Sequence, residues 1–467
     1  MSAVGETFAV TDPATGQKLA AVPRMGAEET QRALEAATRA LPAWRARPAK
    51  QRALVLRRIA DLMLERIDHL AALLVREQGK PLAEAEAEIA YAASFYEWFA
   101  EEGKRVYGDT IPPPTQDRRI LVLKQPVGVT AGITPWNFPS AMVTRKSAPA
   151  LAAGCTMVLK PAEQTPLSAL AIAEVAEEAG LPPGVLSIVT GDAEDAPAIG
   201  AEMTSNPHVR KLGFTGSTAV GKLLMAQCAP TLKKVSLELG GNAPFVVFDD
   251  ADLDVVMDAF LACKFRNSGQ TCISANRILV QTGIFDELAA RLSDLAGGLK
   301  VANGFDEGAQ VGPLIDGQGF EKVEAHVADA IERGAELVTG GSRHSLGGTF
   351  FQPTVLTGVS VDALMSSEET FGPVAGLIPF DTEEQAVALA NDTPYGLAAY
   401  YFTNDVGRTW RVGEALEAGI VALNTGFIST EVAPFGGVKE SGIGREGSKY
   451  GIDEWLELKY VAIGGLG

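Results

Sequence analysis

Two residues of one stretch carry the most reactive chemistry in the sequence, the carboxylate of Glu238 and the thiol of Cys272. Glu238 stands in the turn LELGG, and Cys272 follows in the polar loop NSGQTC after one amphipathic segment. A thiol can attack a carbonyl carbon, and a carboxylate with a raised pKa can activate water. The pair predicts covalent catalysis through a thioester. An isolated cysteine is more often a buried apolar residue, which is our interpretation of Cys155, Cys228 and Cys263.

Polar groups also follow three of the predicted strands. In TPWNFP, Asn137 can donate its amide to an oxyanion, and an equally supported alternative is that it caps the next helix. In LKPAEQTP, Lys160 and Glu163 can hold a ribose diol, and an exposed salt bridge is the alternative. The Gly-rich turn at residues 213–221 can place backbone amides against a phosphate, although it lacks the G-x-G-x-x-G spacing. None of these segments identifies a site by itself.

Strands and helices alternate from residue 127 onward, which predicts an α/β fold with a parallel, doubly wound sheet. Helices are expected near 141–153, 166–180 and 218–228, between the apolar strands VGVTAGITP, TMVLKP, VLSIVTG, KLGFTG and KVSLEL. Sheets of this kind bind ligands at the C-terminal ends of their strands. The polar segments described above all lie at such ends.

The remaining segments frame this alternating region. A hairpin is expected at residues 6–23, and three or four helices at 27–110, where Tyr91, Phe95, Trp98 and Phe99 recur on one face and predict core packing. A second alternating series begins after residue 243 and includes a helix at 252–265. The tail 453–463 alternates like an edge strand, which is unprotected unless another subunit pairs with it.

The composition limits the class of protein. The chain has 467 residues, 46% of them hydrophobic, so two or three folding units are expected. A net charge of −18 without a basic stripe argues against binding to nucleic acid or to an anionic membrane. Neither a membrane-spanning apolar run nor a secretory signal is visible. Four cysteines without paired spacing, and four histidines, predict no metal site and a reducing, cytoplasmic compartment.

Six motifs in a fixed order resemble the NAD(P)-dependent aldehyde dehydrogenase superfamily over nearly the whole chain: PWNFP, KPAEQTP, GFTGSTAVG, LELGGNAP, GQTC and EETFGPV. TRKSAPALAAGCTMVLKP, FRNSGQTC and SGIGREGSKYGIDEWLELKY resemble its succinate-semialdehyde dehydrogenase branch. The resemblance implies a doubly wound parallel-sheet cofactor domain at 1–112 and 127–238. It also implies an α/β catalytic domain at 239–446 and a β oligomerisation arm at 113–126 and 447–467, so a homodimer or homotetramer is expected.

The resemblance also implies residue roles. Cys272 attacks the aldehyde, Asn137 and the Cys272 backbone amide hold the oxyanion, and Glu238 activates the water that hydrolyses the thioester. Lys146 and Glu446 match residues that relay protons or shape the site. Ten positions match cofactor contacts: Ile133, Trp136, Lys160, Glu163, Gly216, Ser217, Val220, Leu239, Glu369 and Phe371.

Three further positions match the pocket for the distal carboxylate of succinate semialdehyde, namely Arg145, Arg266 and Ser429. Arginine can bind a carboxylate through two parallel hydrogen bonds, and structural ion pairing is the alternative. The reaction implied is oxidation of succinate semialdehyde to succinate, with glutarate semialdehyde or 2-oxoglutarate semialdehyde as alternative substrates. A non-catalytic protein of the same fold is disfavoured because Cys272 and Glu238 are both present.

Two positions distinguish this chain within the family. Ser274 stands where many members carry a second cysteine, so a disulfide switch with Cys272 is not expected. Glu163 stands where NADP-preferring relatives often have a small residue. A carboxylate there accepts hydrogen bonds from a ribose diol and repels a 2′-phosphate. NAD is therefore the expected cofactor, with NADP as the second choice.

Overall fold

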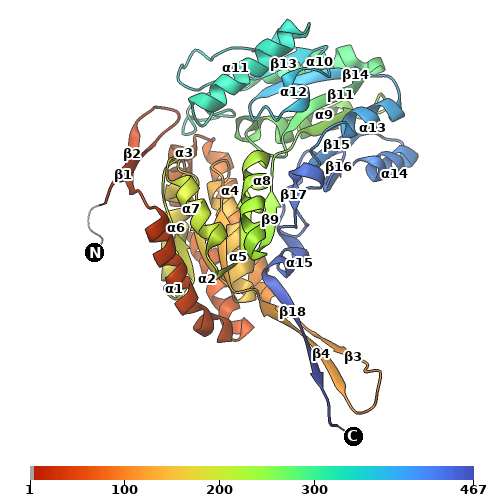
Figure 1. The fold of residues 1–467 in the computed structure, drawn as a ribbon. Coiled ribbons are helices and arrows are strands. Elements are labelled where there is room, and N and C mark those ends of the chain that lie inside the picture. The colour runs from red at the N-terminus through yellow and green to blue at the C-terminus, as the bar shows by residue number, and fades with distance from the viewer. Residues whose placement is uncertain (1–4, 467) are drawn as a thin grey trace.

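The computed structural model describes residues 5–466, which form a hairpin and three larger sheets (Figure 1). The hairpin pairs β1 (Thr7–Thr11) with β2 (Lys18–Pro23), as predicted. The helices expected between residues 27 and 110 are four: α1 (Ala27–Ala46), α2 (Ala49–Glu65), α3 (Ile67–Gln78) and α4 (Leu82–Glu102). A short 3-10 turn, Gly103–Arg105, follows α4.

A six-stranded sheet forms the centre of the first half and has the order β17-β9-β8-β5-β6-β7. The chain runs outward from β5 through β6 to β7, then returns to β8 and β9 on the other side of β5. This reversal is the topological switch at which such sheets bind ligands. The strands are β5 (Val129–Ile133), β6 (Thr156–Lys160), β7 (Leu186–Ile188), β8 (Val209–Thr215), β9 (Lys234–Glu238) and the antiparallel β17 (Gly442–Ile443).

Helices cover both faces of this sheet because alternate strand residues point to opposite sides. Met157 and Leu159 of β6 belong to the core formed with α2–α6, whereas Val158 packs with α1, α7 and α8. The helices added here are α5 (Pro139–Ala153), α6 (Pro166–Glu178), α7 (Ala196–Ser205) and α8 (Thr218–Cys228). Proline at the first position favours the start of α5 and α6.

A seven-stranded sheet forms the centre of the second half, in the order β12-β13-β14-β11-β10-β15-β16. Only β12 is antiparallel to its neighbour among these described strands. Its strands are β10 (Ala243–Val247), β11 (Ala275–Gln281), β12 (Glu336–Thr339), β13 (Thr354–Thr357), β14 (Val374–Phe380), β15 (Ala398–Phe402) and β16 (Ile420–Leu423). Its helices are α9 (Leu253–Phe260), α10 (Phe285–Gly298), α11 (Gly317–Glu332), α12 (Leu364–Ser367), α13 (Glu383–Asn391) and α14 (Val406–Ala415).

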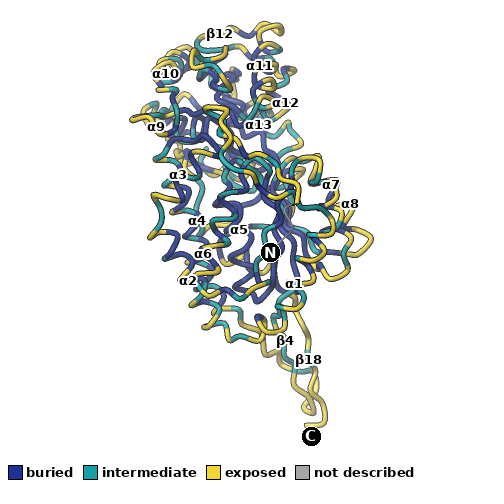
Figure 2. The backbone as a smooth tube through the Cα atoms, turned by 90° about the vertical axis from the view of Figure 1, so that its left-hand side faces the viewer, coloured by how far each residue is buried: buried dark blue, intermediate teal, exposed yellow. Residues whose placement is uncertain are grey.

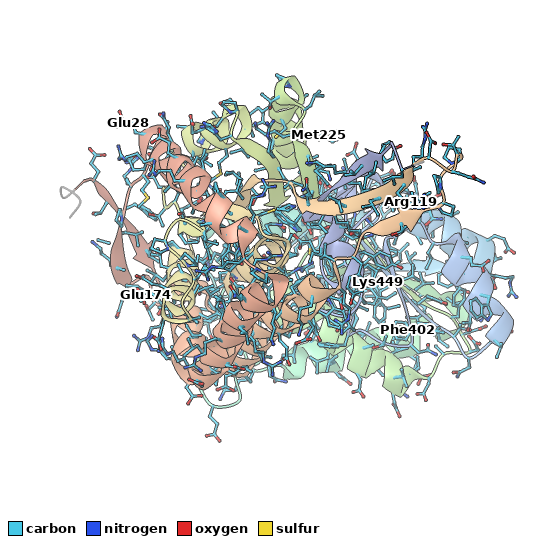
Figure 3. All side chains as sticks on the ribbon, turned by 90° about the horizontal axis from the view of Figure 1, so that it is seen from below. Glu28, Arg119, Glu174, Met225, Phe402 and Lys449 are labelled. Carbon is cyan, nitrogen blue, oxygen red and sulfur yellow. The ribbon has the colours of Figure 1, made fainter. Side chains whose placement is uncertain are left out.

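A three-stranded antiparallel sheet extends from the body as an arm (Figure 1). It joins β3 (Asp109–Ile111), β4 (Arg119–Pro126) and β18 (Leu456–Ile463), and β18 follows the short helix α15 (Ser448–Gly451). The outer part of the arm is exposed (Figure 2), including Leu458 and Tyr460 on the edge strand β18. Seen from below, Arg119 on β4 and Met225 on α8 also lie at the surface (Figure 3).

The structure confirms the α/β fold class, and it differs from the sequence expectations in several helices. No helix was predicted for the segments of α7 and α14, each of which contains glycine. The helix expected at 252–265 ends at Phe260, and residues 261–265 form a π-helical turn. Such turns are rare and occur often at functional sites.

The predicted domain boundaries stay predictions, and two contacts cross them. Strand β17, from the range assigned to the catalytic domain, pairs with β9 of the six-stranded sheet. Trp455, from the range assigned to the arm, is buried in the core of α2–α6. Across residues 5–466, the helices are all too short or too polar to cross a membrane.

Candidate active site

A cavity of about 460 Å³ lies at the C-terminal ends of β5, β8 and β9. It brings together nine of the residues that the sequence singled out: Trp136, Asn137, Gly216, Ser217, Glu238, Leu239, Cys272, Glu369 and Phe371. Ile133 and Lys160 are the last residues of β5 and β6, and Val220 lies in the first turn of α8. Glu163 lines an adjoining cavity of about 400 Å³, and Gln164 and Asp316 line both.

The loop that carries Cys272 has a strained backbone. Asn267, Ser268 and Gly269 have φ values of 52°, 57° and 74°, in the left-handed region that non-glycine residues rarely adopt. Glycine is required at position 269, where a Cβ atom would lie 2.2 Å from the Gly372 carbonyl oxygen. Ser268 Oγ donates to the Gly312 carbonyl over 2.9 Å. The strain is therefore held by contacts with neighbouring segments.

Asn267 ties this loop to the loop of Asn137. Its side-chain amide donates to the Asn137 carbonyl over 2.9 Å, and its backbone N–H donates to Glu84 Oε2 over 2.7 Å. Asn137 Nδ2 in turn donates to the Gln270 carbonyl over 3.2 Å. A side-chain amide has two N–H groups, so this bond leaves Asn137 one donor for a ligand.

A buried ion pair between Lys80 and Glu88 holds Asn137 in position. Lys80 Nζ lies 2.5 Å from Glu88 Oε2 and donates to the Asn137 carbonyl over 2.9 Å. Glu88 Oε1 accepts the backbone N–H groups of Ser140 and Ala141 at the start of α5. The pair therefore fixes both the asparagine and the helix that follows it. Sequence reasoning missed this pair, because Lys80 lies in the loop between α3 and α4 and Glu88 is one of several glutamates on α4.

Glu238 approaches the Cys272 loop because the turn after β9 contains glycine. A Cβ atom at Gly241 would lie 2.4 Å from the Cys272 carbonyl oxygen, so any side chain there would separate the two segments. Glu238 is buried, and neither carboxylate oxygen has a hydrogen-bond partner within residues 5–466. Burial raises the pKa of Glu238 well above its ordinary value, and the charge of Glu446 adds to the rise.

Cys272 is half-buried, whereas the other three cysteines are buried. The surrounding protein raises the pKa of the Cys272 thiol to about 12, chiefly by desolvation and secondly through Glu369. The thiol is therefore protonated at neutral pH and needs a base to become a nucleophile. Glu238 and Cys272 line the same cavity.

A second buried network joins Lys146, Arg145 and Glu446. Lys146 Nζ donates to Glu446 Oε1 over 2.6 Å and to Thr215 Oγ1 over 2.7 Å. Arg145 Nε lies 2.9 Å from Glu446 Oε2, but the N–H does not point along this line, so the contact is an ion pair without a hydrogen bond. Burial opposes ionisation of Glu446, but the charges of Lys146 and Arg145 outweigh it and lower its pKa.

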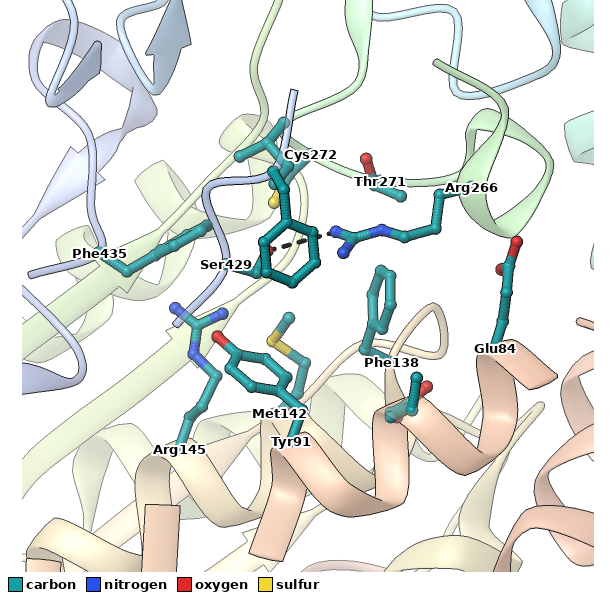
Figure 4. A pocket seen from close by; sticks show the side chains of 14 residues that line it. Glu84, Tyr91, Phe138, Met142, Arg145, Arg266, Thr271, Cys272, Ser429 and Phe435 are labelled. Atoms are coloured by element: carbon teal, nitrogen blue, oxygen red, sulfur yellow. Dashed lines mark hydrogen bonds between the residues drawn. The ribbon is translucent and has the colours of Figure 1, made fainter. Parts of the chain in front are cut away.

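A smaller pocket of about 150 Å³ meets the first cavity at Cys272, which lines both (Figure 4). Arg145, Arg266 and Ser429, the three residues expected to hold a distal carboxylate, line this pocket, and Arg266 Nη2 donates to Ser429 Oγ over 3.3 Å. The Arg145 guanidinium lies 4.0 Å from the centre of the Phe435 ring. Apolar groups complete most of the wall, from Ala87, Phe138, Met142, Ile273, Phe427 and Phe435.

The remaining predicted cofactor contacts lie along the larger cavity. Ser217 caps α8, accepting the Val220 N–H at its Oγ, and leaves the helix N-terminus at the cavity. Phe371, with φ 57°, packs edge-on against Trp136 with ring centres 5.4 Å apart. Burial raises the pKa of Glu369 to about 7, and its Oε1 accepts the Gly241 N–H over 3.3 Å.

Lys160 and Glu163 form an ion pair at the end of β6, where Nζ and Oε2 are 3.7 Å apart. Burial lowers the pKa of Lys160, while Glu163 opposes this effect. Lys160 Nζ also donates to the Pro161 carbonyl over 3.2 Å. The two side chains are thus fixed next to each other beside the two cavities.

Comparison with known proteins gives the family directly. The model of the aldehyde dehydrogenase family matches residues 1–461. The chain is 62% identical to a succinate-semialdehyde dehydrogenase of Escherichia coli (strain K12), GabD, whose name includes NADP(+). The match covers 98% of this chain and 95% of GabD. A glutarate-semialdehyde dehydrogenase of Pseudomonas aeruginosa is 60% identical, covering 99% and 95%.

A solved structure agrees with the sequence relatives. The crystal structure of succinate-semialdehyde dehydrogenase from Burkholderia pseudomallei superposes with a TM-score of 0.97, at 61% identity and with 98% of this chain and 94% of that chain covered. The resemblance inferred from the motifs is confirmed by these matches. The chain belongs to the aldehyde dehydrogenase family.

Proposed function

We propose that this aldehyde dehydrogenase oxidises succinate semialdehyde to succinate through a thioester on Cys272. The observation that carries the proposal is the pocket beside Cys272, in which Arg145 and Arg266 face apolar walls. Arg145 Nη2 and Arg266 Nε are buried and have no hydrogen-bond partner among the described residues. Leaving buried donors unpaired is costly, and a distal carboxylate would satisfy both. The names of the relatives, which act on ω-carboxy aldehydes, support the same substrate class.

Placement of the substrate follows from the two ends of this pocket. A carboxylate held by Arg145, Arg266 and Ser429 directs the aldehyde carbon toward the Cys272 thiol. The pocket volume of about 150 Å³ suits a short aliphatic chain between the two. Attack by the thiolate then yields a tetrahedral oxyanion, which needs donors placed where the charge develops. The free N–H of the Asn137 amide and the Cys272 backbone N–H would supply them.

The Cys272 thiol is protonated at rest and would lose its proton to water in the cavity before or during attack. Hydrolysis of the thioester then needs a base that activates a second water molecule. Glu238 lines the same cavity, and its raised pKa makes it a stronger base than an exposed carboxylate. After the acyl group has formed, the same carboxylate can accept a proton from the attacking water. Glu446, Lys146 and Thr215 would carry that proton away from the cavity.

The larger cavity fits a nicotinamide dinucleotide. Its Gln164 Oε1 is buried without a hydrogen-bond partner in residues 5–466, and the α8 N-terminus at Ser217 offers backbone N–H groups to a phosphate. The residues that would hold the cofactor are Ile133, Trp136, Lys160, Glu163, Gly216, Ser217, Val220, Leu239, Glu369 and Phe371. When bound, the cofactor supplies the acceptor for the hydride that leaves the aldehyde carbon.

We propose NAD as the preferred cofactor on the evidence of Glu163. Its carboxylate lies 3.7 Å from Lys160 Nζ and lines the cavity that adjoins the main one, where a ribose diol can reach it. A 2′-phosphate there would meet a negative charge. The name of the Escherichia coli relative carries NADP(+), so the preference depends on this single side chain.

The exposed arm supports assembly into a homodimer or homotetramer. β18 is an edge strand of the three-stranded sheet, and Leu458 and Tyr460 on it are more than 60% exposed. An edge strand with apolar side chains is stabilised by pairing with another chain. The arm is therefore the surface through which we expect subunits to associate.

Glutarate semialdehyde is the second candidate substrate, favoured by the 60% identical relative that is named for it. A series of aldehydes separates the two: kcat/KM is measured for succinate, glutarate and 2-oxoglutarate semialdehydes and for butanal, which lacks the carboxylate. We expect succinate semialdehyde to exceed butanal by about 100-fold, because each charge-assisted hydrogen bond contributes roughly 1.5–3 kcal/mol. Equal values for butanal and the acids would contradict the assignment of Arg145 and Arg266.

A further inference from the structure

Tyr91 is a half-buried tyrosine whose hydroxyl is buried and makes no hydrogen bond to any residue in the described part of the chain. Buried tyrosines are paired: Tyr96 Oη lies 2.8 Å from Ser147 Oγ, and Tyr400 Oη donates to the Ile273 carbonyl over 2.8 Å. Buried polar groups without partners are rare and need an explanation. Tyr91 therefore has a donor whose partner is outside the protein chain or absent.

The hydroxyl faces the pocket beside Cys272. Tyr91 is among the residues that line it, and in Figure 4 its hydroxyl points toward the Arg145 guanidinium. Its ring is fixed by an edge-on contact with Phe95, with ring centres 4.9 Å apart. The sequence predicted core packing for this side chain, and its ring does pack against the α2–α6 core. Only the hydroxyl is left to face the pocket.

Other polar atoms of the residues that line this pocket are also unpaired. Arg145 Nη2, Arg266 Nε and Tyr91 Oη are all buried and without hydrogen-bond partners within residues 5–466. They come from α5, the loop before Cys272 and α4, so no single local structure explains them. A shared ligand with several acceptor positions would satisfy all three.

We infer that the Tyr91 hydroxyl donates a hydrogen bond to the distal carboxylate of the substrate, as a specificity-determining residue beside the two arginines. This inference rests on the proposed function. A carboxylate has about four acceptor positions on its two oxygens, enough for Arg145, Arg266 and Tyr91 together. Burial raises the pKa of Tyr91, although Arg145 works against the rise, so the hydroxyl keeps its proton at neutral pH.

Replacing Tyr91 by phenylalanine removes the donor and keeps the ring. For Tyr91→Phe we expect the KM for succinate semialdehyde to rise about tenfold with kcat within twofold, and the KM for butanal to stay unchanged. A hydrogen bond to a charged group is strong enough for a change of this size. The control is Tyr96→Phe, on the same helix, whose hydroxyl is also buried but is paired with Ser147 outside the pocket. The control should leave both KM values unchanged.

Thermal unfolding supplies a second readout. Tyr91→Phe should keep or raise the Tm, because it removes an unpaired buried hydroxyl, whereas Tyr96→Phe should lower it by breaking a hydrogen bond. An unchanged KM for succinate semialdehyde in Tyr91→Phe, or an equal change for butanal, would overturn the inference while leaving the proposed function in place. A wild-type enzyme that does not prefer succinate semialdehyde to butanal would overturn both.

Discussion

Glu238 and Glu446 are two buried carboxyl groups whose pKa values move in opposite directions. Burial and the charge of Glu446 raise the pKa of Glu238. Glu446 is also buried, but Lys146 and Arg145 lower its pKa. Glu446 therefore stays ionised, whereas Glu238 keeps its proton to higher pH than an exposed carboxyl group does. Two titratable groups whose surroundings separate their pKa values in this way are typical of acid–base sites.

The first prediction concerns Glu238→Gln, which removes the base and keeps the shape of the side chain. Acyl transfer to Cys272 should still occur, so a stopped-flow experiment should retain a burst of NADH. Steady-state turnover should fall about 100-fold or more, since a general base contributes roughly 10²- to 10⁴-fold. Turnover at the wild-type rate would remove Glu238 as the base for hydrolysis.

The second prediction concerns Glu446→Gln. The substitution removes the negative charge that raises the pKa of Glu238, and it frees the positive charges of Lys146 and Arg145 to stabilise the ionised form of Glu238. Both effects lower the pKa of Glu238. The rising acid limb of kcat against pH should therefore move to lower pH.

Stability provides an independent check on the same variant. Removing one partner of a buried ion pair costs about 3–5 kcal/mol, so the free energy of unfolding should fall by this order. An acid limb that moves to higher pH, or does not move, would show that Glu446 does not set the pKa of Glu238.

The third prediction concerns cofactor choice. Glu163→Ser removes the carboxylate near the ribose, so kcat/KM with NADP relative to NAD should rise at least about tenfold. Glu194→Gln is the control, because Glu194 lines the same side cavity but pairs with Arg24 on the surface. A wild-type enzyme that already uses NADP as well as NAD would contradict the role given to Glu163.

The fourth prediction concerns a buried lysine behind the Cys272 loop. Lys264 is fully buried, and its Nζ donates to Ser274 Oγ over 3.3 Å. Burial lowers its pKa from 10.5 to about 7. Between pH 7 and 10.5, Lys264 is protonated in the unfolded chain but not in the folded protein. The free energy of unfolding therefore falls as the pH falls from 10.5 toward 7.

Lys264→Met should therefore raise the free energy of unfolding at pH 7, by at most about 5 kcal/mol at roughly 1.4 kcal/mol per pKa unit. The gain should shrink as pH approaches 10.5. Urea unfolding of the wild type and the variant at pH 7 and pH 10 measures this gain in the free energy of unfolding. A gain that grows with pH would contradict the direction of this pKa shift.

Much of the candidate site was predictable because its residues follow buried strands. Glu238 is the last residue of β9 and Asn137 follows the end of β5 by four residues, and short apolar runs bounded by turn residues locate such strands from sequence. In a doubly wound sheet the C-terminal ends of the strands share one edge. The motif order then identified the family, and with it the matching positions.

The parts that were not predictable depend on contacts between distant segments. Lys80 lies in the loop between α3 and α4 and Glu88 lies on α4, and only the folded chain shows that the pair holds Asn137. The π-helical turn before Arg266 arises where α9 meets the strained Cys272 loop, and helical periodicity continued through it. The Tyr91 hydroxyl was assigned to the core with its ring, because periodicity places a side chain on a face but does not place its terminal atom.

The most direct test of thioester catalysis at Cys272 uses the Glu238→Gln enzyme. The mass of the intact protein is measured after it is mixed with succinate semialdehyde and NAD. Acylation without hydrolysis should leave one succinyl group on the chain, and peptide mapping should place it on Cys272. The double variant that also carries Cys272→Ala should stay unmodified. No adduct, or an adduct on Cys155, Cys228 or Cys263, would contradict thioester catalysis at Cys272.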